Sequence, residues 1–297
     1  MKDKGISSSA VTAVMLIGLL FMSSGAILVR FADDVHPVVM GAYRMLFSSA
    51  ILIAIARFRG LSFDFVSRKD FLLGCLSGIF LAGHFATWIT SLLYTSVANS
   101  VMLVNMNPIF LCILAFLFFR EKQSFAIILS IIIAFAGCYI LTIGDRCFIG
   151  FSGGSGLIIG NSLALAGAFT QSFYLLIGSR LMMRMNLLTY VTIVYTSAAF
   201  SLVALSLSMG LSFTGFKPSS WLFLFLMGLF PQILGHSSFN WALKYIKSSI
   251  VAIVKMGEPI LSAILAYLFF TETITFTQLA GMALIFIGIL IALRKGE

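Results

Sequence analysis

Pro259-Ile-Leu-Ser-Ala-Ile-Leu-Ala-Tyr-Leu-Phe-Phe-Thr-Glu272 is the stretch that decides the fold, because the chain carries it twice. Its other copy is Pro108-Ile-Phe-Leu-Cys-Ile-Leu-Ala-Phe-Leu-Phe-Phe-Arg-Glu121, and nine of the fourteen positions are identical. A shift of 151 residues between the halves also aligns Tyr94 with Tyr245. We infer an internal repeat of several helices, which in an apolar chain favours a transporter with its site at the repeat interface.

The composition excludes a soluble globular protein. Hydrophobic residues make up 60% of the chain and charged residues only 10%, against roughly 25% charged residues in soluble domains. Most of this surface must therefore face lipid, where backbone polar groups have to be satisfied within helices or a closed barrel. The apolar runs continue for about 20 residues without the two-residue alternation of barrel strands, which predicts membrane-spanning helices.

Ten spans are predicted, five in each half of the chain. An odd number of spans per repeat gives the two halves opposite orientations, so we expect an all-α integral membrane protein built from two inverted five-helix repeats. The first repeat is expected at residues 1–149 and the second at 150–297, joined by the glycine-rich loop Gly150-Phe-Ser-Gly-Gly-Ser-Gly156. The predicted spans are 11–30, 36–56, 70–93, 97–119, 125–143, 156–180, 187–208, 219–241, 249–270 and 276–293.

The placement of cations supports this count. With ten spans, fourteen lysines and arginines fall on one side, and only Arg30, Arg146 and Lys217 fall on the other. Cytoplasmic loops carry the excess of cations, so both termini are predicted in the cytoplasm. The cation-rich side holds Lys2, Lys4, Arg57, Arg59, Arg68, Lys69, Arg120, Lys122, Arg180, Arg184, Lys244, Lys247, Arg294 and Lys295.

Other classes of site and partner find little support in the sequence. Four cysteines lie singly in different segments without metal-ligand spacing, so no disulfide, metal or other cofactor is predicted. The net charge of +9 is explained by membrane orientation rather than by nucleic acid, and lipid is the expected partner besides a small-molecule substrate. The apolar run from Val11 to Val29 is too long for a signal peptide and is predicted to be an uncleaved first span.

Two further segments carry a resemblance to a known family. They are Gly83-His-Phe-Ala-Thr-Trp-Ile-Thr-Ser-Leu-Leu-Tyr-Thr-Ser-Val-Ala-Asn99 and Gly235-His-Ser-Ser-Phe-Asn-Trp-Ala-Leu-Lys244. Together with the repeated proline-to-glutamate stretches, they resemble the drug/metabolite transporter superfamily of EamA type. The resemblance implies a bacterial cytoplasmic (inner) membrane protein whose spans 1 to 4 and 6 to 9 enclose a midplane cavity, with spans 5 and 10 as scaffold. Similar proteins export amino acids and other metabolites, import vitamins or exchange nucleotide sugars.

Ionisable groups inside spans are functional candidates because burying them in a membrane is costly. Lys255 and Glu258 share a helical face about 9 and 13 Å from the start of span 9, which places Glu258 near the midplane. Pro259 removes a backbone hydrogen bond beside that carboxylate and is expected to loosen the helix there. We predict that both charged groups bind substrate and that Glu258 carries the coupling proton. The alternative is that the two charges only neutralise each other.

Arg44 is the third charged candidate. Counted along span 2, it lies about 12 Å from the outer surface, close to the depth expected for Glu258. A bridge between Arg44 and Glu258 would free Lys255 for a substrate carboxylate or phosphate and would break and form during transport. A purely structural bridge between the two helices is the alternative.

The remaining candidates are polar or aromatic. His84 and Trp88 share one helical face, as do His236 and Asn240, so each pair is predicted to contact substrate. Each histidine could instead change charge near neutral pH during proton coupling. The alternatives are neutral imidazoles bonded to neighbouring helices, and a tryptophan that packs at the membrane interface. Two asparagines complete the set of predicted substrate-binding residues, although amides between membrane helices also serve as structural contacts. They are Asn105 and Asn107, and Asn107 occupies the repeat position of Glu258.

These features predict a secondary transporter of a small polar or zwitterionic metabolite, such as an amino acid, working by alternating access. No nucleotide-binding motif occurs in the sequence, so proton coupling or substrate exchange is expected in place of ATP coupling. A flippase for lipids or isoprenoid carriers is the alternative function. An intramembrane enzyme is not expected, because it would need paired carboxylates, a Ser/His arrangement or a metal triad at one depth.

Overall fold

The computed structural model describes residues 7–60, 66–95, 97–143, 155–271 and 273–295. Over these residues the chain forms thirteen α-helices and one π-helix, which confirms the predicted all-helical membrane fold. Nine helical spans in the described part are long and apolar enough to cross a membrane, and α6 is a shorter apolar helix. The segments are α1 (Ser8–Phe31), α2 (Pro37–Phe58), α3 (Arg68–Ser91), α4 (Val97–Val104), α5 (Asn107–Phe119), α6 (Phe125–Ile143), α7 (Ser155–Leu181), α8 (Leu187–Ser208), α9 (Pro218–Met227), η2 (Gly228–His236), α10 (Ser237–Ala242), α11 (Ser248–Lys255), α12 (Glu258–Phe270) and α13 (Phe276–Lys295).

Short polar side chains mark where several spans begin. The hydroxyl of Ser67 accepts a hydrogen bond from the backbone N–H of Asp70 at 3.1 Å, at the start of α3. The side chain of Asn186 likewise accepts from the N–H of Thr189 at 2.8 Å, at the start of α8. Such caps satisfy backbone donors that have no partner within the helix. Long apolar runs therefore form the spans, and capping residues set their ends.

Two predicted spans are broken at matching positions of the repeat. Span 4 divides into α4 and α5 around Asn105 and Met106, and span 9 divides into α11 and α12 around Met256 and Gly257. The second residue after each break is a proline, Pro108 in α5 and Pro259 in α12, and proline cannot donate a backbone hydrogen bond. The sequence anticipated the loosening beside Glu258. The spans predicted at 97–119 and 249–270 are present, each as a pair of half-helices.

The third irregular span has no counterpart in the first repeat. Span 8 runs through α9, the π-helix η2 and α10, and η2 contains Pro231. The N–H of Ser237 bonds to the carbonyl of Gln232, five residues earlier, as the wider π-turn requires. The matching span of the first repeat, α3, is one continuous helix. The π-turn was not expected from the sequence.

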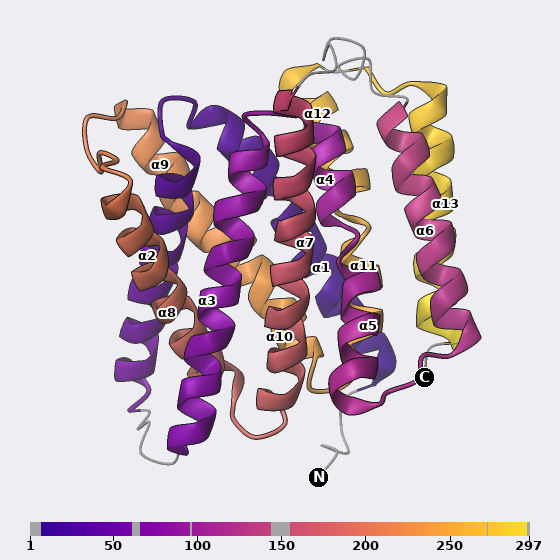
Figure 1. Cartoon of the computed structure of the whole chain (residues 1–297), viewed down its shortest axis with the longest axis horizontal. Helices are drawn as coiled ribbons and strands as arrows, with labels where there is room; N and C mark the ends of the chain where they lie inside the picture. Colours follow the sequence, from indigo (N-terminus) through magenta and orange to yellow (C-terminus); the bar gives the residue numbers. More distant parts are fainter. Residues whose placement is uncertain (1–6, 61–65, 96, 144–154, 272, 296–297) are drawn as a thin grey trace.

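The repeats exchange their contacts instead of packing as separate bundles. Helix α3 of the first repeat packs against α7 and α8 of the second, while α1 packs against η2 and α12. Helix α2 of the first repeat also packs against α8 of the second. Figure 1 shows α6 and α13 side by side at one edge of the bundle. This arrangement leaves the other eight spans around the centre, as the resemblance implied.

Glycines allow the closest approach between α6 and α13. A Cβ atom on Gly137 would lie 2.6 Å from the carbonyl oxygen of Gly281, and one on Gly281 would lie 2.5 Å from the backbone nitrogen of Leu141. Neither distance leaves room for a side chain, so the two backbones meet directly. Such small-residue contacts replace the hydrophobic effect as the source of helix association in lipid.

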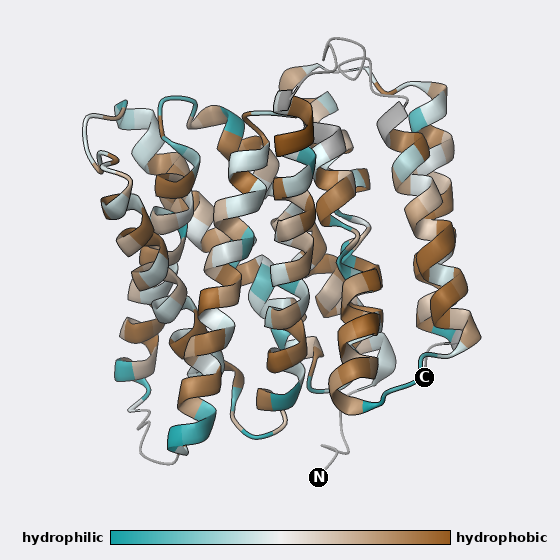
Figure 2. Ribbon diagram, viewed as in Figure 1, coloured by the Kyte–Doolittle hydropathy of each residue, from teal (hydrophilic) through white to brown (hydrophobic). Residues whose placement is uncertain are grey.

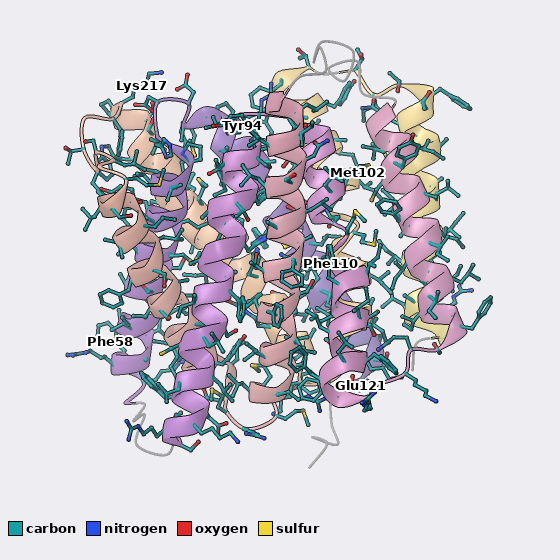
Figure 3. The ribbon with its side chains drawn as sticks, in the orientation of Figure 1. Phe58, Tyr94, Met102, Phe110, Glu121 and Lys217 are labelled. Carbon is teal, nitrogen blue, oxygen red and sulfur yellow. The ribbon has the colours of Figure 1, made fainter. Side chains whose placement is uncertain are left out.

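The outer surface and the two ends of the bundle differ in polarity. Apolar residues dominate the sides in Figure 2, and hydrophilic residues gather at the ends. In Figure 3, Phe58 and Glu121 lie at one end and Tyr94 and Lys217 at the other. Helix α1 begins and α13 ends at the end that carries Glu121 (Figure 1). An even number of crossings requires this arrangement.

The end that carries Lys217 is held by two aspartates in the turn between α1 and α2. Lys217 donates to Asp33 at 2.9 Å. The carboxylate of Asp34 accepts from the Ser220 hydroxyl at 2.5 Å and from the Lys217 backbone N–H at 2.6 Å, at the start of α9. These hydrogen bonds lower the pKa of Asp34. The turn between α1 and α2 thus caps a helix of the other repeat.

Candidate functional site

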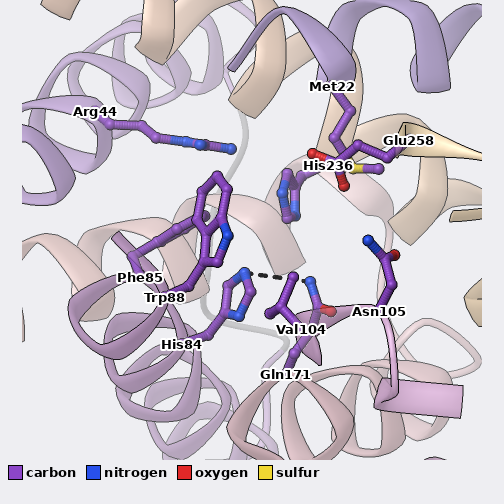
Figure 4. Close-up of a pocket in the computed structure, with 10 residues that line it drawn as sticks. All are labelled: Met22, Arg44, His84, Phe85, Trp88, Val104, Asn105, Gln171, His236 and Glu258. Carbon is purple, nitrogen blue, oxygen red and sulfur yellow. Dashed lines mark hydrogen bonds between the residues drawn. The ribbon is translucent and has the colours of Figure 1, made fainter. Parts of the chain in front are cut away.

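A pocket lies at the centre of the bundle and is lined by residues of seven spans. Figure 4 shows side chains from both repeats directed toward it, from α1, α2, α3, the break after α4, α7, η2 and the start of α12. Six of the nine sequence-predicted residues line this pocket. The lining residues are Met22, Arg44, His84, Phe85, Trp88, Val104, Asn105, Gln171, His236 and Glu258.

Arg44 forms one wall of the pocket and is almost completely buried, with 1% of its surface exposed. Its Nε donates a hydrogen bond to Oε1 of Gln232 at 2.8 Å, and its guanidinium carbon lies 4.2 Å from the centre of the Phe85 ring. Nη2 is buried and has no hydrogen-bond partner within the described part of the chain. A buried guanidinium with a free donor is a strong attractor for a carboxylate.

Glu258 lies on the facing wall, at the first residue of α12. Figure 4 shows its carboxylate directed into the pocket beside Met22 and His236. The positive end of the α12 helix dipole favours an anion at this position. Among the residues that the structure describes, no ion pair involves Glu258, so the bridge to Arg44 considered above is not formed. The pocket therefore holds opposite charges on two walls.

His84 and Trp88 form the floor between these walls. Nδ1 of His84 lies 3.0 Å from the carbonyl of Gly167, and Nε2 lies 3.3 Å from the amide nitrogen of Gln171. Nδ1 must donate to the carbonyl and Nε2 must accept from the amide, which is the pattern of a neutral imidazole. The His84 and Trp88 rings stack 5.9 Å apart, almost parallel at 3°. The indole Nε1 of Trp88 is buried with no partner among the described residues.

Three predicted residues do not line the pocket. Lys255, 2% exposed, ends α11 and interacts electrostatically with Glu258. Asn107 begins α5, and neither polar atom of its buried side chain has a partner in the described structure. Asn240 is fully buried in α10 and contacts two tyrosines instead.

The tyrosines around Asn240 form a buried network that the sequence did not reveal. The Tyr174 hydroxyl donates to Oδ1 of Asn240 at 2.7 Å, and Nδ2 of Asn240 donates to the Tyr195 hydroxyl at 3.3 Å. Tyr195 also lies 3.1 Å from the Ser237 hydroxyl. The network joins α7 and α8 to α10. A tyrosine within an apolar run gives no signal that its hydroxyl is buried.

Removing one hydroxyl from this network should destabilise the protein. Tyr174→Phe leaves Oδ1 of Asn240 buried without its donor, at a cost of about 1–3 kcal/mol. We expect the melting temperature in detergent to fall by about 2–4 °C for each kcal/mol. Tyr139→Phe, the same change at an exposed tyrosine, serves as the control and should melt as the wild type does. Equal melting temperatures for both variants would contradict a stabilising network.

Two comparisons with known proteins match nearly the whole chain. The EamA-like transporter family matches residues 9–143 and 158–294, once in each half of the chain. A solved crystal structure covering 96% of this chain and 97% of its own superimposes with a TM-score of 0.80 at 21% sequence identity. At that identity the likeness concerns the fold alone.

Curated relatives carry the description "Uncharacterized transporter". One from Archaeoglobus fulgidus is 35% identical over 27% of this chain and 29% of its own length. One from Clostridium kluyveri is 27% identical over 67% of this chain and 64% of its length, so both matches span less than two thirds of the relative. The Bacillus subtilis transporter YyaM is 25% identical over 86% of this chain and 84% of its own length.

Proposed function

Because the chain belongs to the EamA-like transporter family, and is therefore a membrane transporter, we propose that it moves a small zwitterionic metabolite by alternating access. An amino acid or a related compound fits this description. The observation that carries the proposal is the pair of opposite charges, Arg44 and Glu258, on two walls of one central pocket.

The arrangement of donors and acceptors suits both ends of an amino acid. The substrate carboxylate would bind Nη2 of Arg44 and Nε1 of Trp88, two buried donors that lack partners in the described structure. The substrate ammonium group would bind Glu258. Phe85, Met22 and Val104 would contact its apolar part. Each charged end would then be hydrogen-bonded in the site, which offsets its loss of water.

Alternating access is supported by the broken spans. Half-helices that meet at a midplane site are common in secondary transporters, because they free backbone groups and provide a hinge. Both breaks lie beside the pocket, at Asn105 in one repeat and directly before Glu258 in the other. In our proposal the repeats, residues 1–149 and 150–297, tilt about these breaks and expose the pocket to each side in turn.

We propose proton coupling through Glu258. It is the one carboxylate among the described residues that line the pocket, and no ion pair in that part of the chain ties it permanently to a cation. A carboxylate that alternates between substrate and proton couples the two movements. The excess of cations on one side supports a cytoplasmic membrane location with both termini in the cytoplasm.

A ligand screen on the purified protein tests this function. We expect amino acids to raise the melting temperature in detergent, while nucleosides, vitamins and S-adenosyl compounds do not. The compounds that stabilise the protein should then be transported in proteoliposomes with a pH gradient. Stabilisation by copurified lipid headgroups alone would instead support a flippase and contradict the proposal.

A further inference from the structure

The π-helix η2 contains one residue more than the matching part of the first repeat. Its first residue, Gly228, is equivalent to Gly78 of the first repeat, because both make the same close contacts with the facing helix. A Cβ on Gly78 would meet Val194 and Ser197 of α8, and one on Gly228 would meet Arg44 and Phe47 of α2. Gly78 and Gly228, Arg44 and Val194, and Phe47 and Ser197 are each 150 residues apart. Tyr94 and Tyr245, which follow this region in each repeat, are 151 residues apart.

The extra residue changes which side chains reach the pocket. A π-turn rotates the residues that follow it relative to a regular helix, and such turns often occur at functional sites. Gln232 lies within the π-turn, is completely buried and accepts the hydrogen bond from Nε of Arg44. The first repeat has only apolar Leu81 and Ala82 at the position equivalent to Gln232. The residue equivalent to Arg44 is Val194 of α8, which is also apolar. The hydrogen bond between Arg44 and Gln232 therefore has no equivalent at the matching residues of the other repeat.

Arg44 thus has a neutral partner in a place where proteins commonly use a carboxylate. The amide oxygen of Gln232 fixes the orientation of the guanidinium, and the Phe85 ring packs against it. Neither contact neutralises its charge, and no ion pair involves Arg44 in the part of the chain that the structure describes. Nη2 remains without a partner.

We propose that Gln232 is a positioning residue that determines selectivity for carboxylate-bearing substrates. It holds Arg44 with its free edge toward the pocket and leaves the guanidinium without a directly bonded carboxylate until a substrate carboxylate arrives. This inference rests on the proposed transport of zwitterions and names the residue that selects their anionic end. A glutamate at this position would occupy Arg44 internally and compete with the substrate.

Gln232→Glu tests the inference, with Gln278→Glu as the matched control. Gln278 accepts a hydrogen bond from the Thr275 backbone at the start of α13, away from the pocket, and glutamate can accept the same bond. The probes are leucine and phenylalanine, each compared with its amide, which keeps the ammonium group and loses the carboxylate. Melting temperatures in detergent are measured with and without each probe.

Two results are expected. Without any probe, Gln232→Glu should melt about 2–4 °C above the wild type because the buried guanidinium gains an anionic partner, while Gln278→Glu should not. The wild type and Gln278→Glu should bind each amino acid at least about tenfold more tightly than its amide. Gln232→Glu should reduce this preference to about twofold or less.

Other outcomes separate the two proposals. An unchanged acid-to-amide preference in Gln232→Glu, or a Gln232→Glu protein that fails to fold or melts no higher without probes, overturns the role of Gln232. A wild type that responds to no probe counts against zwitterion transport. In that case the comparison of melting temperatures without probes still decides whether Gln232 leaves Arg44 without an anionic hydrogen-bond partner.

Discussion

Replacement of Glu258 by glutamine is expected to abolish proton-coupled transport while leaving the protein folded. Glutamine has nearly the same shape and can still accept a hydrogen bond from a substrate ammonium group, but it can neither carry a negative charge nor release a proton. Since Glu258 is the one carboxylate among the described lining residues, no other carboxylate there can replace it as the proton carrier. Uptake driven by a pH gradient in proteoliposomes should fall to the level of empty vesicles.

Glu121→Gln is the matched control for this prediction. Glu121 follows α5 at the end of the bundle and pairs with Arg180, far from the central pocket. It also belongs to the repeated stretch, so it tests whether a repeated glutamate is important merely because it is repeated. We expect this variant to keep most of its coupled uptake. Full activity of the Glu258→Gln variant would remove this carboxylate from the mechanism.

Arg44→Lys should cause the second large loss, although it preserves the positive charge. Lysine is a single charged point and cannot donate to Gln232 and to a substrate carboxylate with the fixed fork of a guanidinium. It would also lose the packing of the planar guanidinium against Phe85. We expect the affinity for a zwitterionic substrate to fall by at least about tenfold, measured as the half-saturation concentration for binding.

An arginine on the same helix provides the comparison. Arg57 lies in the last turn of α2 and is exposed, so Arg57→Lys should leave the binding constant unchanged. Both variants should be tested for folding by their melting temperatures. If Arg44→Lys binds substrate as tightly as Arg57→Lys does, the guanidinium is not the carboxylate site.

The sequence predicted most of the architecture because the governing constraints are local. Apolar run length determines which segments span the membrane, and the repeat of Pro108 to Glu121 in Pro259 to Glu272 revealed the duplication. Glu258 and Arg44 were identified because ionisable groups are rare within spans. Pro259 indicated the break in its span because a proline lacks a backbone hydrogen-bond donor.

The contacts of these residues were less predictable. Spacing on one helix suggested that Asn240 accompanies His236 into the pocket, yet Asn240 bonds to Tyr174 and Tyr195 of two other helices. Gln232 was visible as a polar residue within a span, but its π-turn depends on how η2 packs against α1 and α2. No spacing rule along one helix reports which face a neighbouring helix covers.

By itself the sequence determined that this chain is a duplicated bundle of membrane helices with a few charged groups at mid-depth. The cost of burying polar groups in lipid accounts for that, and it acts on each segment separately. Only the tertiary structure decided that Arg44 bonds to neutral Gln232 and not to Glu258. That choice depends on the relative rotation of packed helices and on one additional residue in a π-turn, because hydrogen bonds form only over about 3 Å.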